Sequence, residues 1–342
     1  MRRFPEQGTV APWRGRALAR VVGAAAALTA LLALASCASV PQRAPSEWLG
    51  ALPADAILYA SLSVDGSKDL LRKTLEEAGK DFKDVASLTG MTSRMVCSVT
   101  MEKGSPVRFA VVALGSYPSG IIGMKLGGNK EWKKVATPNG RYWQWSKAGI
   151  QMSLPNNAIL LASNGGIESL LTDWKDPAPV TMPPDVAEDM KSADLVLYMP
   201  VLPGGLAESA QKKGVHLPIQ EVWLNAVKTK AGYGFSGTAN TGSEKEAKVL
   251  TLALKLGIVA WMRTQKVPNA SEMLKTITVT ANGLQVEMAG LNLSDDEVIP
   301  LFLSLIKGLS PAETEAASTG DAAPQAGGAS AEVPVGDSAE TE

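Results

Sequence analysis

Nucleophilic and basic side chains suited to catalysis are few in this 342-residue chain. It contains two cysteines, Cys37 and Cys97, and a single histidine, His216. A Ser-His-Asp or Cys-His site needs a histidine as its general base, so His216 would have to serve in any such site. No serine lies in a Gly-x-Ser-x-Gly turn, and His216 lies in a Gly-Val-His-Leu-Pro segment typical of a loop. We therefore predict no catalytic residue and a protein that is not an enzyme.

Metal and cofactor sites are not predicted either. One histidine and one free cysteine are too few ligands for an ordinary zinc site. Residues 232–237 match the Gly-x-Gly-x-x-Gly pattern of dinucleotide sites, but they alternate like a strand, and the next helix begins only after Ser243. The acidic residues 295–297 lie at the start of a helix, where the helix dipole favours negative charge. Cys97 falls on the apolar face of an alternating strand, where a thiol is usually inert.

Cys37 follows an N-terminal segment with a clear charge and hydropathy pattern. Residues 1–20 contain five arginines and one glutamate, and residues 21–35 are almost entirely apolar. This apolar stretch is shorter than the ~20 residues that a bilayer-spanning helix needs, but it has the length of the apolar part of a signal peptide. The pattern predicts export of the chain.

The four residues Leu34-Ala35-Ser36-Cys37 resemble the lipobox of bacterial type II signal peptides, and Ser36 resembles the looser lipoboxes of spirochaetes. In that family the cysteine thiol receives a diacylglycerol, the signal peptide is cut off before the cysteine, and the new amine is acylated with a fatty acid such as palmitate. Two or more acyl chains anchor a protein stably, whereas one binds only marginally. The resemblance implies a lipoprotein held on a membrane through Cys37. The alternative is a plain secretory signal with an incidental cysteine.

The charge and the residues after Cys37 limit which partners and which membrane are expected. Without residues 1–36 the chain has 28 basic and 33 acidic groups, a net charge of −5. Nucleic acid attracts clustered positive charge, so no nucleic-acid partner is predicted. Residues 38 and 39 are Ala-Ser, without the aspartate that retains enterobacterial lipoproteins at the inner membrane. We therefore favour the outer membrane of the cell envelope over the inner membrane.

Four segment pairs occur in the same order in the two halves of the chain and indicate an internal duplication. Alternating apolar residues predict strands near residues 95–101, 150–154, 277–279 and 284–288. The predicted fold class is α+β, with two similar units of mostly antiparallel sheet and packed helices; whether the two sheets join stays open. The matched pairs are 54–59 with 193–198, 100–105 with 238–243, 149–152 with 283–286, and 167–171 with 298–302.

Helix signals accompany these strands. Ser243 with Glu246, and Ser294 with Glu297, have the spacing of capping boxes. The helix after Ser243 is apolar on nearly every side, so we expect it to be buried. The predicted organisation is a signal peptide (1–36), a lipidated N-terminus and tether (37–50), a first repeat (51–176), a Pro-rich linker (177–192), a second repeat (193–309) and a disordered acidic tail (310–342).

Aromatic side chains gather in one short segment. Trp132, Tyr142, Trp143 and Trp145 lie within fourteen residues, and strand alternation places Trp143 and Trp145 on one face. Such side chains fill cores or form apolar surfaces that contact a ligand or lipid. Both interpretations stay open, and these four residues are our candidate apolar contact site.

A predicted amphipathic helix at residues 297–309 presents an apolar face that we expect to pack on the core, although such a stripe can also enter a membrane interface. With the lipobox, it makes the chain resemble treponemal outer-membrane lipoproteins that carry amphipathic helices and interact with bilayers. The predicted function is a non-enzymatic, membrane-anchored envelope lipoprotein that binds an apolar small molecule or a lipid surface. The alternatives are a module that binds another envelope protein and an enzyme of unrecognised type. The apolar face of the helix contains Val298, Leu301, Phe302, Leu305 and Ile306.

Lipidation of Cys37 can be tested by growing cells with a radioactive fatty acid. We expect label in the wild-type chain and none in a Cys37→Ala variant, because only this thiol stands in the lipobox context. A Cys97→Ala variant is the matched control and should keep its label. Equal labelling of the Cys37→Ala variant would show that the anchor lies elsewhere.

Overall fold

The computed structural model describes residues 48–77, 90–101, 107–146, 149–202, 218–264, 267 and 270–300. Leu34, Ala35, Ser36, Cys37 and His216 lie outside the described residues, as does the tail at 310–342. The chain divides into one compact unit of residues 1–310 and a second of residues 311–342, and the described elements all belong to the first.

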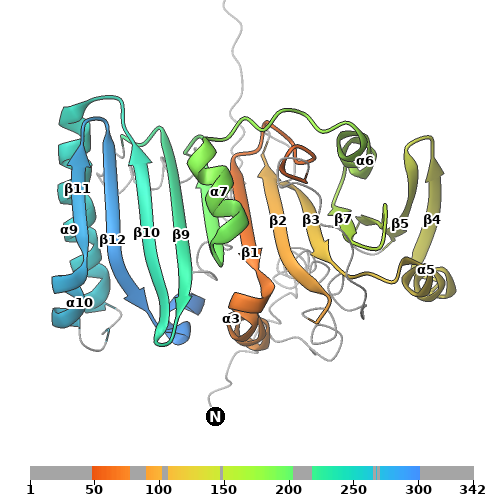
Figure 1. Cartoon of the computed structure of the whole chain (residues 1–342), viewed down its shortest axis with the longest axis horizontal. Coiled ribbons are helices and arrows are strands. Elements are labelled where there is room, and N and C mark those ends of the chain that lie inside the picture. Colours follow the sequence, from red (N-terminus) through yellow and green to blue (C-terminus); the bar gives the residue numbers. More distant parts are fainter. Residues whose placement is uncertain are drawn as a thin grey trace, which may run out of the picture. The chain divides into compact units, whose positions relative to one another are not determined.

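One twelve-stranded antiparallel sheet organises the described residues (Figure 1). The strand order is β11-β12-β10-β9-β8-β1-β2-β3-β7-β6-β5-β4, and each neighbouring pair runs antiparallel. With its helices, the sheet confirms the predicted α+β class. The strands are β1 (Leu58–Ser63), β2 (Thr92–Thr100), β3 (Arg108–Gly115), β4 (Trp132–Thr137), β5 (Gly140–Trp145), β6 (Ile150–Ser153), β7 (Ile159–Ser163), β8 (Leu195–Met199), β9 (Glu221–Thr229), β10 (Gly232–Asn240), β11 (Thr278–Asn282) and β12 (Gln285–Leu293).

The two halves of the chain meet at β1 and β8. Tyr59 pairs with Tyr198 in the register, and their rings stack with centroids 6.0 Å apart. The hydroxyl of Tyr59 donates to the carbonyl of Pro53 at 2.6 Å, and that of Tyr198 donates to Oε1 of Glu221 at 2.6 Å. The halves therefore share one sheet, which the sequence left open.

The strand order runs alike on both sides of this pair: β1-β2-β3-β7-β6 on one side and β8-β9-β10-β12-β11 on the other. The matched segments follow this symmetry only in part. Residues 149–152 begin β6, whereas residues 283–286 begin β12, which occupies the place of β7. Residues 100–105 follow from β2, whereas 238–243 follow from β10, which occupies the place of β3. The internal duplication is therefore not confirmed.

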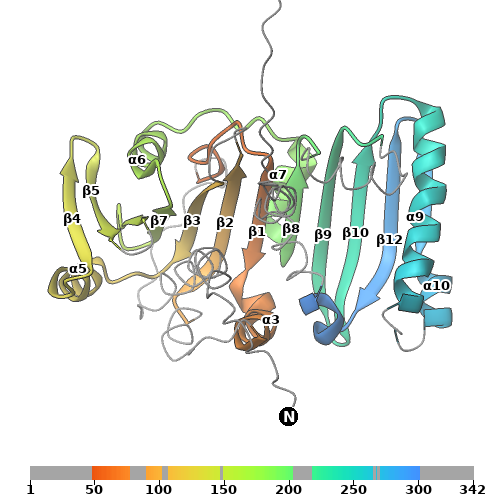
Figure 2. The same ribbon diagram turned by 180° about the vertical axis from the view of Figure 1, so that it is seen from behind.

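Helices cover both faces of the sheet, because strand side chains alternate between two cores. Met95 and Val111 face one core, whereas their neighbours Val96 and Val112 face the other. Helix α7 packs on β1 and β8, and Figure 1 shows it in front of the sheet next to β1. Helix α9 packs on β11 and β12, and Figure 2, which views the sheet from behind, shows it in front of the sheet next to β12. The first face carries α3 (Val64–Glu77), α5 (Ser119–Gly128), α9 (Glu244–Thr264) and α10 (Ala270–Thr276); the other carries α6 (Ile167–Lys175) and α7 (Pro184–Ser192).

The predicted capping boxes are confirmed. The amide of Glu246 donates to Oγ of Ser243 at 3.3 Å, and the amide of Ser294 donates to Oε2 of Glu297 at 2.7 Å. The neighbouring carboxylates also have structural partners: Asp295 pairs with Lys228 at 2.5 Å and Asp296 with Lys73 at 2.8 Å. Val298 and Ile299 are buried in the core that α3 covers, while residues 301–309 lie outside the described part.

Two expectations from the sequence need correction. Residues 177–192 are not only a linker, because helix α7 begins at Pro184, directly after its N-cap residue Pro183. The expectation that the helix after Ser243 is buried is wrong. This helix, α9, buries only Ala247, Leu250 and Met262, because it lies at the end of the sheet and packs on β11 and β12 from one side.

Arg94 joins β2 to the C-terminal end of α7. Its guanidinium donates to the carbonyls of Met190 and Ala193 at 3.0 and 2.9 Å and to Oγ of Ser61 at 2.9 Å. Ser61 in turn donates to the carbonyl of Met190 at 2.8 Å. The last carbonyls of a helix have no partner within it, so Arg94 satisfies them and places positive charge at the negative end of the dipole. Burial lowers the pKa of Arg94.

Substitution of Arg94 tests this joint. We expect Arg94→Met to reduce the free energy of unfolding by about 2–4 kcal/mol, because buried carbonyls lose a charged donor. Urea denaturation of the chain without residues 1–37 gives this free energy. The control, Lys191→Met on the exposed side of α7, should cost less than about 0.5 kcal/mol. A similar cost for both variants would contradict the role of Arg94.

Candidate functional site

The predicted aromatic site is divided between the two faces of the sheet. Trp132 and Trp145 stand opposite each other on β4 and β5 and stack with centroids 6.0 Å apart. Trp143 lies on the same face and is 5% exposed, whereas Tyr142 faces the other core. The hydroxyl of Tyr142 donates to Oε1 of Glu168 at 3.3 Å. Tyr142 and Trp143 thus fill cores. Of the four predicted contact residues, only the half-buried pair of Trp132 and Trp145 remains available for contact with a ligand or lipid at the protein surface.

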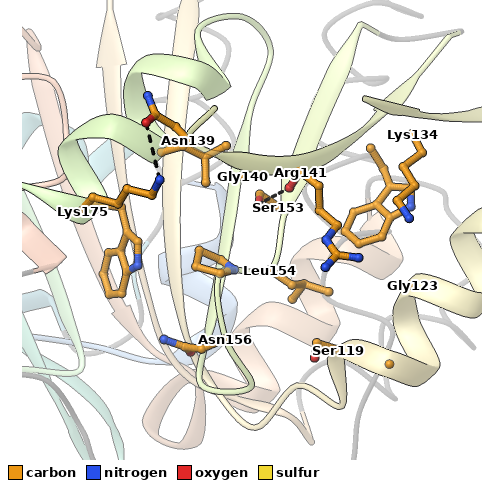
Figure 3. Close-up of a pocket in the computed structure, with 15 residues that line it drawn as sticks. Ser119, Gly123, Lys134, Asn139, Gly140, Arg141, Ser153, Leu154, Asn156 and Lys175 are labelled. Atoms are coloured by element: carbon orange, nitrogen blue, oxygen red, sulfur yellow. Dashed lines mark hydrogen bonds between the residues drawn. The ribbon is translucent and has the colours of Figure 1, made fainter. Parts of the chain in front are cut away.

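A cavity of about 740 Å³ opens beside this hairpin (Figure 3). Strand β6 is short: its pairing with β5 reaches Met152 opposite Trp143, and the chain then turns away at Leu154 and Pro155. The first residues of β5 therefore have no neighbouring strand on this side, apart from the hydroxyl of Ser153, which donates to the carbonyl of Arg141 at 2.7 Å. The early end of β6 leaves the space that becomes the cavity.

The cavity walls come from four parts of the chain. These are the first half of α5, the β4–β5 hairpin, the turn after β6, and the end of α6. Figure 3 shows Arg141 directed into the middle of the cavity with Lys134 beside it, and Lys175 on the opposite side next to Asn139. The lining residues are Ser119, Gly120, Gly123, Lys134, Asn139, Gly140, Arg141, Trp143, Ser153, Leu154, Pro155, Asn156, Leu171, Trp174 and Lys175.

A second surface lies on the outward side of α9. Val249, Leu252 and Leu256 are 54%, 60% and 62% exposed. Residues three and four apart lie on one side of a helix, so these three form a continuous apolar strip, which we call the outer strip. Exposed basic side chains accompany it on the same helix: Lys245, Lys248, Lys255 and Arg263. A protein surface exposes an apolar strip of this kind most often where something binds it.

Sequence reasoning missed both surfaces. The apolar residues of α9 were visible, but their number suggested burial, and only the position of α9 at the end of the sheet shows which side stays exposed. The cavity had no sequence signal, because Lys134, Arg141 and Lys175 come from three different elements.

Four further findings describe what the remaining residues can do. Burial raises the pKa of the Cys97 thiol to about 11, so this thiol is protonated and weakly nucleophilic at neutral pH. Among the described residues no group of histidine, cysteine and acidic side chains could hold a metal ion. No described helix is long and apolar enough to cross a membrane. Residues 232–237 form the first part of β10, as the alternation predicted.

Comparison with solved structures identifies the fold. TP0453 in crystal form III matches with a TM-score of 0.56 at 15% identity, covering 78% of this chain and 100% of that chain. Crystal form I matches with a TM-score of 0.54 at 16% identity, covering 78% and 98%. A comparison with curated proteins gave no match.

A family comparison goes further than the fold. The family described as outer membrane-associated lipoprotein TP0453 matches residues 43–231, which is more than half of the chain. This confirms the resemblance to treponemal outer-membrane lipoproteins. The chain therefore belongs to the TP0453 family of outer membrane-associated lipoproteins and is a lipid-anchored lipoprotein of the cell envelope.

Proposed function

We propose that the globular body of this lipoprotein is a non-enzymatic module that lies on the lipid surface of the membrane through α9. The observation that carries the proposal is the outer strip of Val249, Leu252 and Leu256, each more than half exposed. An amphipathic helix that lies in the interface buries such a strip at the boundary between headgroups and acyl chains. The opposite side of α9 is fixed on the sheet by Ala247 and Leu250, so the strip stays directed outward.

The energy available from this contact is modest. Burying the exposed parts of three aliphatic side chains contributes about 3 kcal/mol in total, because burying a whole Val or Leu side chain contributes about 1.5–3 kcal/mol and each of these is little more than half exposed. This corresponds to about a 100-fold increase in the partitioning of the protein from water to the membrane surface. It cannot hold the protein on a membrane alone, but it orients a body that the lipid on Cys37 already keeps at the surface, because stable attachment combines two signals.

Charge supports the same orientation. Lys245, Lys248 and Lys255 are exposed on α9, and each basic group near an anionic bilayer contributes about 1 kcal/mol. The remaining chain is net negative, so this attraction is local to the helix. The strip should bind neutral lipid weakly, and anionic lipid should add a component that salt screens.

Two alternative functions remain as outcomes of the test. An apolar small molecule would need an apolar cavity, whereas the 740 Å³ cavity carries three basic side chains on its walls. An envelope protein could cover the outer strip in place of lipid. The non-enzymatic part of the proposal is supported by the single histidine of the chain and by the raised pKa of Cys97.

Vesicle binding by the chain without residues 1–37 tests the proposal, because the lipid anchor is then absent. We expect weak binding to phosphatidylcholine vesicles that persists at high salt and falls at least tenfold in the triple variant Val249→Gln, Leu252→Gln, Leu256→Gln. The measurement is co-sedimentation, with tryptophan fluorescence as a second readout.

A matched control removes exposed apolar side chains elsewhere. Val227 and Leu284 are 53% and 51% exposed on β9 and in the β11–β12 turn, so Val227→Gln, Leu284→Gln should leave vesicle binding unchanged. If the wild-type chain binds no vesicle, the proposed contact with a lipid surface is wrong, and an envelope protein becomes the favoured partner of the outer strip. Equal losses in both variants would show that α9 has no special part.

A further inference from the structure

We propose that the cavity between α5, the β4–β5 hairpin, the turn after β6 and α6 is a binding site for a phosphate-bearing small molecule. The site is separate from the outer strip: the cavity lies at the β4–β5 end of the sheet, whereas α9 packs on β11 and β12 at the other end. The proposal does not depend on lipid binding by α9.

The cavity has the size of a small-molecule site. Its volume of about 740 Å³ lies within the range of about 300–1,000 Å³ that small-molecule sites occupy. Gly120 leaves open space on the α5 wall, because a Cβ atom at this position would meet no atom within 4 Å. Gly140 has a φ of +145°, which strongly favours glycine, and its position opens the hairpin turn toward α6.

The charge of the walls selects the ligand. Lys134, Arg141 and Lys175 line the cavity, and none of its fifteen described lining residues is acidic. Lys134 and Arg141 occupy diagonal positions on one face of the β4–β5 hairpin, where long side chains come within reach of each other. Neither has an ion-pair partner among the described residues. Two like charges side by side without a counter-charge repel each other, and a bound anion would remove this repulsion.

The types and positions of these groups favour phosphate. A guanidinium binds phosphate oxygens in a fork geometry, and lysine adds a compact positive charge. Helix α5 begins at the cavity with Ser119 and Gly120, so the positive end of its dipole adds to the same field. Lys175 contacts the carbonyl of Pro138 and Oδ1 of Asn139 at 3.5 Å each, which places its ammonium at the rim opposite Arg141.

The remaining walls provide contacts for the rest of the molecule. Trp143, Trp174, Leu154 and Pro155 present apolar surface, and Asn139, Asn156 and Ser119 present polar groups. A sugar phosphate and the headgroup of a phospholipid share this chemistry: one phosphate joined to a small body with hydroxyl groups and apolar edges. The walls therefore fit a phosphate ester better than inorganic phosphate.

Isothermal titration calorimetry on the full-length chain in a non-ionic detergent tests the site. The probes are inorganic phosphate, glucose 6-phosphate, glucose and short-chain phosphatidylglycerol. We expect binding of at least one phosphate ester, tighter than inorganic phosphate and weakened by salt, and no binding of glucose. Preference for glucose 6-phosphate would assign a soluble ligand, and preference for phosphatidylglycerol would assign a lipid headgroup; both outcomes support the site.

Matched variants locate the binding. The double variant Lys134→Gln, Arg141→Gln should lose at least tenfold in affinity, and Lys175→Gln should lose less, because Lys175 lies at the opposite rim. The double variant Lys130→Gln, Lys133→Gln removes the same charge from exposed positions outside the cavity and should bind normally. All these side chains are exposed, and circular dichroism melting checks that each variant folds as the wild type does. No binding of any phosphate compound up to about 10 mM, or equal losses in both double variants, would overturn the proposal.

Discussion

The antiparallel pairing of β1 with β8 is the contact on which the rest of the structure depends. These strands come from different halves of the chain, and their pairing turns two partial sheets into one. The stacked rings of Tyr59 and Tyr198 hold the register from one face, and burial raises the pKa of both hydroxyls above the ordinary value. A slip of one residue would move the ring on the shifted strand to the opposite face and separate it from the other ring, so the register is strongly specified.

Helix α7 depends on this pair and also secures it. It lies across β1 and β8, and its buried residues Val186 and Met190 belong to the core on that face. Arg94 from β2 and Ser61 from β1 both bind carbonyls at the end of α7, so two neighbouring strands and the helix are connected through polar contacts. Apolar packing alone has no preferred direction, whereas a hydrogen bond forms only over a narrow range of distances and angles. These contacts therefore fix the position of α7 on the two strands.

The sequence predicted those parts of the fold that depend on local periodicity. The alternation of Met95 and Cys97 gave β2, the Ser294 and Glu297 spacing gave a capping box, and the alternation within residues 232–237 indicated a strand in place of a nucleotide loop. The exposed side of α9 could not be predicted this way. Its helix is apolar around most of its circumference, and only the location at the end of the sheet decides which side has a partner.

The residues of the candidate sites could also be predicted only where local alternation was sufficient. Alternation alone placed Trp143 and Trp145 on one face, and Tyr142 necessarily on the other, but burial of Trp143 depends on α5, whose Gly123 lies against the tryptophan ring. The convergence of Lys134, Arg141 and Lys175 depends on the early end of β6 and on the α6 helix. Periodicity carries no information about either, because each brings together elements distant in the sequence.

Protection of the sheet edge is a second explanation for the lysines on β4. An edge strand exposes unpaired amides and carbonyls, and charged side chains on it discourage pairing with another molecule. On edge strand β4, Lys133 and Lys134 both serve this purpose, since either one would interrupt an approaching strand. Arg141 is paired only with β4, because the pairing of β5 with β6 begins at Trp143, so Arg141 also lies beside an unpaired stretch of strand. Edge protection requires only a charge at each of these positions, whereas the cavity brings Lys134, Arg141 and Lys175 together with no acidic residue among its described lining residues. A shared anionic ligand explains that arrangement better than protection of the edge.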